Sequence, residues 1–471
     1  MLEQYKKAFK AYDIRGIYGT ELDANFFFYM WYGLGKHLRE TKGEEATILL
    51  GTDARKINTE CIDAYICWLT NAWIKNIDYI HTGDFDGYPY SIVSTSVSYY
   101  IWQNDRDMTT IFTASHNPAS YTGLKIFNKH AVLTETEKLR TYFQYAYTER
   151  EEIKIPESKS YKQQPEKVQK KIIAYYIRMN DKRTTLQKNH KFVVDFCHGS
   201  GVACEKHFWE QYANNHYITM INDYPDGTFP AHESDTSEPH NFVQLVKIVK
   251  DTWSEFGVML DGDADRIAFV TNTGQIIPGD IIYAIIVKHI LQSIKSNEKP
   301  ICIFDCMTSK TVEETIKQYW WIPQRYKVGR FFIHREMSRV WAILGGEVSG
   351  HYMFKEFWYV ENVLLTQYYV MKELENYNNF DEMVQQYKKY YKWPIQSISV
   401  SDKDIVMKKI ADTFAEYNPT TLDGISVYTD EYRFNVRQSN TENKIRFTVE
   451  ADDEKKREAT VKKIHTLITE E

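Results

Sequence analysis

Three aspartates at alternate positions beside an arginine form the segment with the clearest chemistry in this chain, Leu260-Asp-Gly-Asp-Ala-Asp-Arg266. Carboxylate oxygens suit a hard divalent cation such as Mg²⁺, which also leaves positions for a substrate phosphate. Residues two apart in a straight strand lie roughly 6.6 Å from each other, so Asp261, Asp263 and Asp265 reach one ion only if the backbone curls, as Gly262 allows. We therefore predict a divalent-cation site facing a phosphate, with an acidic turn in solvent as the alternative.

A serine-led turn follows the strand predicted over residues 109–112, in the segment Thr113-Ala-Ser-His-Asn-Pro118. This arrangement places the Ser115 hydroxyl at the carboxyl edge of a sheet, where α/β proteins bind ligands. No G-x-S-x-G elbow surrounds Ser115, so acyl transfer has little support, and a serine that only caps its own turn is the alternative. Lys125 returns after the next turn as a candidate proton-transfer group or phosphate counter-charge, or as an ordinary surface lysine.

Two further segments carry polar groups on predicted loops. In Gly345-Gly-Glu-Val-Ser-Gly-His351, the glycines let the backbone approach a ligand, while Glu347 and Ser349 offer oxygens that suit sugar hydroxyls. Arg437-Gln-Ser-Asn-Thr-Glu-Asn443 lies between two stretches of alternating apolar and polar residues, which predicts a hairpin loop able to cradle a phosphate. A plain glycine-rich turn and an ordinary polar hairpin turn are the respective alternatives.

Composition excludes several classes of protein. The net charge of the 471 residues is -6 and is spread along the chain, so we expect neither nucleic acid nor a membrane as partner. The first residues contain no apolar run of the kind found in signal peptides, and the most apolar stretch, residues 281–291, is too short to span a bilayer. The six cysteines form no C-x-x-C pair, which is typical of reduced thiols in a cytoplasmic protein.

Strands followed by helices recur along the chain and predict α/β units with mixed or parallel sheets. The strands are predicted over residues 47–50, 77–80, 109–112, 191–196, 256–260 and 301–304. A polar stretch at 156–165 is interpreted as a domain linker, and another at 224–239 as a long loop within a domain. After residue 370 we predict a separate α+β module: a helix over 373–391, a strand, a helix over 403–417, three antiparallel strands and a closing helix.

Taken together, the four segments resemble the α-D-phosphohexomutase superfamily, whose phosphoserine, metal, sugar and phosphate loops follow one another in this order. The opening Phe9-Lys-Ala-Tyr-Asp-Ile-Arg-Gly16 is similar to the family's first strand and turn, and Gly346-Glu-Val-Ser-Gly-His-Tyr-Met-Phe354 is most similar to the phosphomannomutase/phosphoglucomutase branch. The resemblance extends over essentially the whole chain.

The resemblance implies three similar mixed α/β domains and a C-terminal α+β domain around a central cleft. The expected boundaries are 1–155 for domain I with the phosphoserine loop, 156–255 for domain II, 256–371 for domain III with the metal and sugar loops, and 372–471 for domain IV with the phosphate loop. The implied partner is a small sugar phosphate, and the protein would be a monomer or homodimer.

The resemblance also implies an intramolecular phosphotransferase that interconverts hexose 1-phosphate and hexose 6-phosphate through a phosphoserine. Ser115 would carry the phosphoryl group, Mg²⁺ would bind Ser115 and the three aspartates, and a hexose 1,6-bisphosphate would act as intermediate and activator. The remaining implied site residues divide by role. Arg15 and Arg266 would hold the transferring group, Lys125 and His116 would move the proton, Glu347, Ser349, His351 and Arg330 would contact the sugar, and Arg437, Ser439, Asn440 and Thr441 would bind the second phosphate.

The chain departs from the family pattern at a few positions. Asn443 replaces a usual proline, and Glu361-Asn362 replaces an acidic pair or Asp-Gly. Arg330 and Met307 stand where relatives carry other sugar-contacting residues, so the preference among mannose, glucose and glucosamine stays open. A metal-dependent sugar phosphatase and a non-catalytic sugar-phosphate sensor are the rival classes.

Tryptophan is abundant at 11 residues while glycine is scarce at 21. Trp73, Trp253, Trp321 and Trp341 stand at predicted helix-to-strand junctions, where a left-handed backbone favours glycine. Trp31 and Trp68 also fall on positions where the family has glycine. One interpretation is a set of ordinary core tryptophans. The other is that the source reads UGA as glycine and that these codons were translated here as tryptophan.

Overall fold

The computed structural model describes residues 3–71, 74, 76–79, 92–96, 106–128, 133–149, 178, 186–212, 216–294, 299–439 and 443–470. It divides into two compact units, the first comprising residues 1–276 with 362–365 and the second residues 277–361 with 366–471. No helix among the described residues is long and apolar enough to cross a membrane. The predicted linker at 156–165 lies outside the described residues.

The first sheet of the first unit has the order β1-β5-β4-β2-β3. Its strands are β1 (Ile14–Ile17), β2 (Thr47–Thr52), β3 (Asn76–Tyr79), β4 (Met108–Phe112) and β5 (Tyr121–Asn128). The helices beside it are α1 (Glu3–Lys6), α2 (Ala24–Lys42), α3 (Asn58–Asn71) and α5 (Thr136–Thr148). β2 pairs in parallel with both β3 and β4, whereas β5 runs antiparallel to β4 and β1. This mixed sheet confirms the strands predicted near residues 47, 77 and 109.

The core of this part is aromatic. Tyr5, Phe9, Phe26 and Phe143 pack with ring centroids 4.8–5.7 Å apart, within the range that favours edge and stacked aromatic contacts. The Asp23 carboxylate accepts the Phe26 N–H and so caps the start of α2. Phe27 and Trp31 of α2 pack against Phe112 of β4, so α2 lies against the sheet whose carboxyl edge carries the predicted serine.

The second sheet has the order β10-β9-β8-β6-β7. Its strands are β6 (Lys191–Asp195), β7 (Tyr217–Ile221), β8 (Phe256–Leu260), β9 (Ile267–Thr271) and β10 (Ile276–Ile277), with helices α7 (Glu205–Tyr212) and α8 (Val243–Asp251). β8 pairs in parallel with β6, so the strand before the predicted metal loop belongs to this sheet. The predicted boundary at residue 255 is therefore wrong. Parallel neighbours need a crossover, and α8 supplies it within one domain.

The second unit begins with a third sheet of the same strand order, β12-β11-β13-β14-β15. Its strands are β11 (Ile301–Asp305), β12 (Ile322–Tyr326), β13 (Leu344–Gly346), β14 (Tyr352–Phe354) and β15 (Val360–Glu361), with helices α9 (Gly279–Ser293), α10 (Lys310–Gln318) and α11 (Arg330–Val340). In the second and third sheets alike, the first strand lies between the second and the third. This repeated order confirms the expectation of similar mixed α/β domains.

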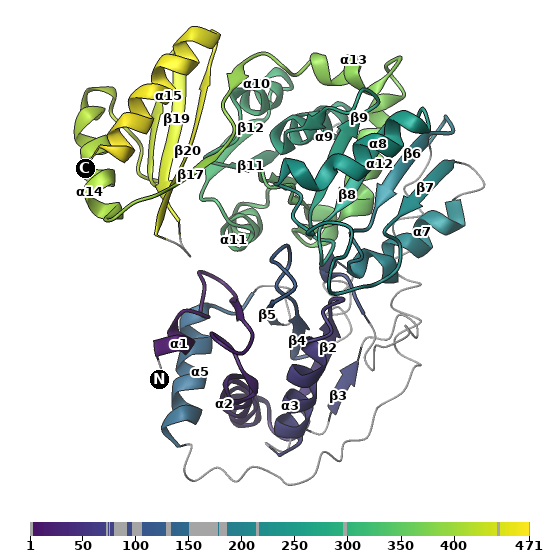
Figure 1. Ribbon diagram of the computed structural model, residues 1–471, viewed down its shortest axis with the longest axis vertical. Coiled ribbons are helices and arrows are strands. Elements are labelled where there is room, and N and C mark those ends of the chain that lie inside the picture. The colour runs from purple at the N-terminus through teal and green to yellow at the C-terminus, as the bar shows by residue number, and fades with distance from the viewer. Residues whose placement is uncertain are drawn as a thin grey trace. The chain divides into compact units, whose positions relative to one another are not determined.

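The C-terminal module is α+β, as predicted. Its sheet comprises β16 (Tyr391–Lys392), β17 (Gln396–Ser399), β18 (Ile425–Tyr428), β19 (Tyr432–Gln438) and β20 (Lys444–Ala451), and its helices are α14 (Lys403–Thr413) and α15 (Glu454–Thr469). The paired strands of this sheet run antiparallel, and α15 runs along β19 and β20 (Figure 1).

The helix predicted over 373–391 is wrong. The chain forms α12 (Val363–Leu374), a turn and the short α13 (Phe380–Gln385) instead. Asparagine explains the interruption, because the Asn379 side chain leaves the helical pattern and accepts the Glu382 N–H as an N-cap.

Candidate active site

The three aspartates of the loop between β8 and β9 converge as predicted. Each of Asp261, Asp263 and Asp265 offers one carboxylate oxygen within 4.8 Å of the other two, and all three side chains are buried. The curl comes from Ala264, whose φ is 53°, whereas Gly262, which was expected to supply it, does not have positive φ and is required for a close approach instead. A Cβ on Gly262 would stand 2.6 Å from the Ser115 carbonyl oxygen, so only glycine fits there.

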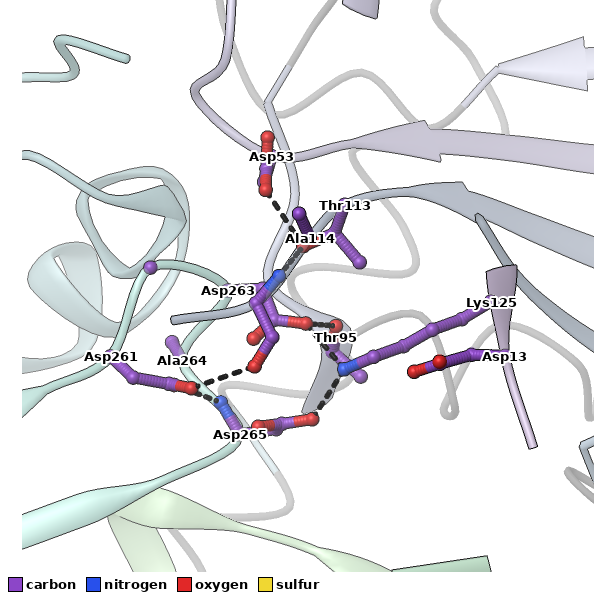
Figure 2. Close-up of polar contacts among 12 residues, drawn as sticks. Asp13, Asp53, Thr95, Thr113, Ala114, Lys125, Asp261, Asp263, Ala264 and Asp265 are labelled. Atoms are coloured by element: carbon purple, nitrogen blue, oxygen red, sulfur yellow. Dashed lines mark hydrogen bonds and ion pairs between the residues drawn. The ribbon is translucent and has the colours of Figure 1, made fainter. Parts of the chain in front are cut away.

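Lys125 on β5 reaches this loop and is not a surface lysine. Its Nζ lies 2.5 Å from Asp263 Oδ2 and 2.6 Å from Asp265 Oδ2, and the residue is 1% exposed. Figure 2 shows the lysine extending between the two carboxylates. A buried cation therefore bridges two buried anions, in the place where sequence analysis expected a proton-transfer group or a counter-charge.

Ser115 stands beside the same carboxylates. Its Oγ donates to Asp261 Oδ2 at 3.1 Å and lies 3.3 Å from His116 Nδ1. Ser115 is 1% exposed and has φ of 54°, a left-handed conformation that is costly for serine and common at functional sites. Ser115 and the predicted metal loop thus lie in contact within the first unit, as we expected.

A buried arginine holds the serine loop from behind. The Arg55 guanidinium donates to the carbonyl oxygens of Ser115 at 3.0 Å and Pro118 at 2.6 Å, and its Nε donates to Asp53. Asp53 also accepts the Thr113 hydroxyl, which in turn accepts the Ser115 N–H. With both Asp53 and Arg55 buried, these charge-assisted hydrogen bonds fix the backbone on which the serine hydroxyl depends.

The metal loop is held through its carbonyl groups by two neighbouring segments. Ser200 donates from both its N–H and its hydroxyl to the Gly262 carbonyl, each at 2.9 Å. The Thr95 N–H donates to the Asp263 carbonyl at 2.8 Å, and the Thr95 hydroxyl lies 2.5 Å from Asp263 Oδ2. The Ser96 hydroxyl donates to the Ala264 carbonyl at 2.9 Å. Both α/β domains of the first unit therefore shape the loop.

Two arginines border the site. Arg15 on β1 donates to Asp13 at 2.9 Å and to the Asn117 side chain at 3.1 Å, so it is held against the serine loop. Arg266 Nε lies 3.8 Å from Asp261 Oδ2. The side chains of Arg15 and Arg266 are each 13% exposed, which leaves positive charge at the border of the buried acids.

The electrostatics of the aspartate loop suit a divalent cation. Burial, reinforced by repulsion from Asp265 and Asp263, raises the pKa of Asp261 well above its usual value. Asp263 Oδ1 is buried and has no hydrogen-bond partner among the described residues. A cation that accepts oxygen ligands would relieve both the repulsion and the unsatisfied oxygen, so the donor set fits Mg²⁺.

The predicted sugar loop lies in the second unit between β13 and β14. Glu347 is 3% exposed and its Oε1 accepts the Gly329 N–H at 2.6 Å, while Gly350 has φ of 92°. His351 Nδ1 lies 3.2 Å from Glu361 Oε1. The loop is thus an ordered turn, and its contact with a sugar stays a prediction.

Arg330 is paired with Glu361, a contact that the sequence did not predict. Its guanidinium forms two hydrogen bonds with the Glu361 carboxylate, at 2.6 and 2.9 Å. Burial alone would raise the pKa of Glu361, but Arg330 and His351 lower it well below its usual value. Glu361, noted above only as a departure from the family pattern, thus anchors two of the predicted sugar-binding residues.

The predicted phosphate loop follows β19. Arg437 is 6% exposed, and its Nε has no hydrogen-bond partner among the described residues. The Ser439 N–H donates to the Lys444 carbonyl at 2.8 Å, and Lys403 Nζ donates to the Ser439 carbonyl at 3.1 Å. Asn440 and Thr441 lie outside the described residues.

The residues that position the reactive groups were not predicted from the sequence. Asp53 and Arg55 carried a usable signal, since charged residues directly follow the apolar strand β2 at the sheet's carboxyl edge. Thr95, Ser96 and Ser200 carried none, because each acts through hydrogen bonds to a loop far along the chain.

Four family models match the chain in succession. The phosphoglucomutase/phosphomannomutase models match residues 6–152 for alpha/beta/alpha domain I, 171–274 for domain II, 278–390 for domain III and 398–466 for the C-terminal domain. A phosphomannomutase of Methanocaldococcus jannaschii is 37% identical over 462 residues, which cover 98% of this chain and 97% of that protein. A phosphomannomutase/phosphoglucomutase of Pseudomonas putida is 27% identical over 455 residues, covering 95% and 92%.

Solved structures share the fold. A phosphoglucomutase/phosphomannomutase family protein of Burkholderia thailandensis superimposes with a TM-score of 0.82 at 22% identity, covering 99% of this chain and 97% of that one. An N-acetylphosphoglucosamine mutase variant of Aspergillus fumigatus, in complex with glucose 1,6-bisphosphate, gives a TM-score of 0.60 at 14% identity, covering 98% and 95%.

Proposed function

Because the chain belongs to the phosphoglucomutase/phosphomannomutase family, we propose that it interconverts hexose 1-phosphate and hexose 6-phosphate through a phosphoserine at Ser115. The observation that carries the proposal is the distance of 3.1 Å between the Ser115 hydroxyl and Asp261 Oδ2. Asp261 belongs to a loop on which three aspartates converge. The family is one of isomerases, and this site contains both the nucleophile and the acidic donors that such a transfer requires.

The donor set of the site suits Mg²⁺, which would be held by Asp261, Asp263, Asp265 and an oxygen of the Ser115 group. When bound, Mg²⁺ neutralises negative charge on the phosphoryl group in transfer. The protein contributes positioning: Arg55 and Asp53 fix the serine loop, and Ser200 fixes the metal loop.

The residues around Ser115 would bind the phosphoryl group and exchange the proton. Arg15 and Arg266 would bind the phosphoryl oxygens, because guanidinium groups pair with phosphate through two parallel hydrogen bonds. Lys125 and His116 would exchange the proton of the sugar hydroxyl. Lys125 Nζ lies between two of the carboxylates that would bind the ion, which puts an exchangeable proton beside the site of transfer.

Residues of the second unit would select the substrate. Glu347, Ser349, His351 and Arg330 would contact the hexose, and Arg437, Ser439, Asn440 and Thr441 would bind the phosphate not in transfer. Support comes from the unsatisfied, nearly buried Arg437 Nε, which suits an anionic ligand. A hexose 1,6-bisphosphate would be the intermediate and activator, and the hexose would be mannose or glucose. We place the enzyme in the cytoplasm as a monomer or homodimer.

The test is a coupled assay with mannose 1-phosphate, glucose 1-phosphate and glucosamine 1-phosphate, each with and without hexose 1,6-bisphosphate. We expect turnover of mannose or glucose 1-phosphate that depends on the bisphosphate, and no turnover by Ser115→Ala, whose circular dichroism should match the wild type. Release of inorganic phosphate without isomerisation would instead identify a phosphatase. Preferential turnover of glucosamine 1-phosphate would overturn the choice of substrate.

A further inference from the structure

Four tryptophans have a left-handed backbone, which bulky side chains rarely adopt because Cβ crowds the following carbonyl. Their φ angles are 56° at Trp253, 65° at Trp320, 59° at Trp341 and 56° at Trp358. Twelve non-glycine residues in the described part of the chain have positive φ. Tryptophan supplies four of these twelve although the whole chain contains only 11 tryptophans among 471 residues, so the association is not one of chance composition.

Each of these tryptophans completes the same helix-ending motif. The residue after it donates its N–H to a carbonyl five positions earlier: Ser254 to Val249 at 3.0 Å, Trp321 to Ile316 at 3.3 Å, Ala342 to Met337 at 3.0 Å and Tyr359 to Phe354 at 2.8 Å. This six-residue closure requires a left-handed residue just past the helix, which is usually glycine. We predicted the left-handed residue of this junction at Trp321. That prediction is wrong by one residue, because the left-handed residue is Trp320.

The side chains give no compensation at three of these sites. Trp253 is 88% exposed, Trp320 81% and Trp341 69%. Tryptophan stabilises a fold chiefly by burying its large apolar surface, and these rings remain largely in water. Lys355 Nζ lies 5.4 Å from the ring centre of Trp341, which is a weak contact at the surface. Backbone and exposure thus both favour glycine at these positions.

Trp31, a buried tryptophan, also fits its surroundings poorly. The ring of Trp31 lies with its centroid only 3.9 Å from that of Tyr65, closer than the usual 4.5–7 Å for aromatic pairs. Its Nε1 is buried without a hydrogen-bond partner among the described residues. A smaller residue would remove both the crowding and the unsatisfied donor. Trp73 lies outside the described residues.

We infer that positions 253, 320 and 341 are glycine in the protein that the source organism makes, because its translation reads the codon UGA as glycine. The tryptophans here then result from applying the standard code. The glycine content agrees, since 21 residues in 471 is well below the usual share of roughly 7%, and replacing ten of the 11 tryptophans would raise the number to 31.

Trp209, in contrast, is expected to be tryptophan in the source organism as well. Trp209 in α7 is 3% exposed and does not have positive φ. Its ring packs edge-on against Phe192 at 5.1 Å and Phe208 at 5.0 Å. We expect UGG at this codon.

Gene sequence and peptide masses test the inference directly. We expect UGA at codons 253, 320 and 341 and UGG at codon 209, together with glycine at the first three positions in tryptic peptides of the protein purified from its source. UGG at codons 253, 320 and 341, or tryptophan in those peptides, would overturn the inference.

Thermal unfolding tests the backbone argument independently of the gene. Trp253→Gly should raise the unfolding midpoint by about 2–4 °C, and Trp253→Ala by clearly less, because alanine keeps the Cβ that strains the left-handed turn. Trp209→Gly should lower the midpoint, since it empties a packed aromatic site. A midpoint for Trp253→Gly at or below that of Trp253→Ala would contradict the strain on which the inference rests.

Discussion

Replacement of Lys125 by methionine tests whether the buried charges of the active site are arranged as described. Methionine has similar length and removes only the cation, leaving Asp263 and Asp265 without the ammonium group that lies 2.5 and 2.6 Å from their oxygens. Breaking a buried ion pair from one side costs about 3–5 kcal/mol, because the remaining charge stays buried and unpaired. We expect Lys125→Met to lose about this much unfolding free energy in EDTA.

Magnesium should restore much of that loss. The ion would supply positive charge to the same carboxylates, and at 100 times its dissociation constant it adds about 2.7 kcal/mol to the folded state. In the wild type the ion competes with Lys125 for these oxygens, so the gain from Mg²⁺ should be larger in the variant. Urea unfolding of both proteins in EDTA and in saturating Mg²⁺ measures the difference.

A second substitution, Asp265→Asn, provides the control. It removes one of the two carboxylates that Lys125→Met leaves without a cation. The double variant Lys125→Met/Asp265→Asn should therefore lose less unfolding free energy than the sum of the two single variants, with a coupling energy of about 0.5–3 kcal/mol. A loss in EDTA below about 1 kcal/mol for Lys125→Met, or equal stabilisation of both proteins by Mg²⁺, would refute the proposed charge arrangement.

Three further predictions concern other parts of the molecule. Thr95→Val removes the hydroxyl 2.5 Å from Asp263 while keeping the backbone contact, so Mg²⁺ should support turnover with an affinity about 10–100-fold lower; an unchanged Mg²⁺ titration would exclude a positioning role. Arg437→Ala should raise KM and lower kcat together if the distal phosphate positions the reacting end, and steady-state kinetics unchanged in both parameters would remove this residue from the mechanism. Burial, together with the nearby Arg330, lowers the pKa of His334 to about 4. Since the unfolded histidine binds a proton below about pH 6.5 and the folded one does not until about pH 4, unfolding free energy should fall by about 3 kcal/mol as pH drops through this window, and His334→Gln should flatten the slope. Identical pH profiles of the two proteins in urea unfolding would contradict that assignment.

Local patterns predicted what depends on local chemistry. The strand over residues 256–260 appears with the same bounds, and the carboxylates that follow it converge as their spacing indicated. The helix over 373–391 failed because side-chain capping by Asn379 outweighed the apolar periodicity. The domain boundary at residue 255 failed because strand pairing is a property of the sheet and not of the segment.

Contacts between segments that are distant along the chain could not be predicted from the sequence. The residues around Thr95 carry no recognisable motif, yet the hydroxyl of Thr95 bonds a carboxylate 168 positions later. Likewise, the charges at Arg330 and Glu361 each appeared as isolated departures from a family pattern, whereas the fold makes them one ion pair. The position of Trp320 differed by one residue from expectation, because helix ends shift by a residue more easily than helices themselves do.

The separation between Thr95 and Asp263 also sets an order of events during synthesis. A ribosome adds about 5–20 residues per second, so the N-terminal domain waits on the order of 10 s before the aspartate loop has been made. During that interval Lys125 has no carboxylate partner from the loop, and Ser115 has no acid beside it. A nascent chain that ends before Asp261 therefore carries Ser115, the proposed phosphoryl acceptor, without the carboxylates of the proposed metal site, which arrive only with the second domain.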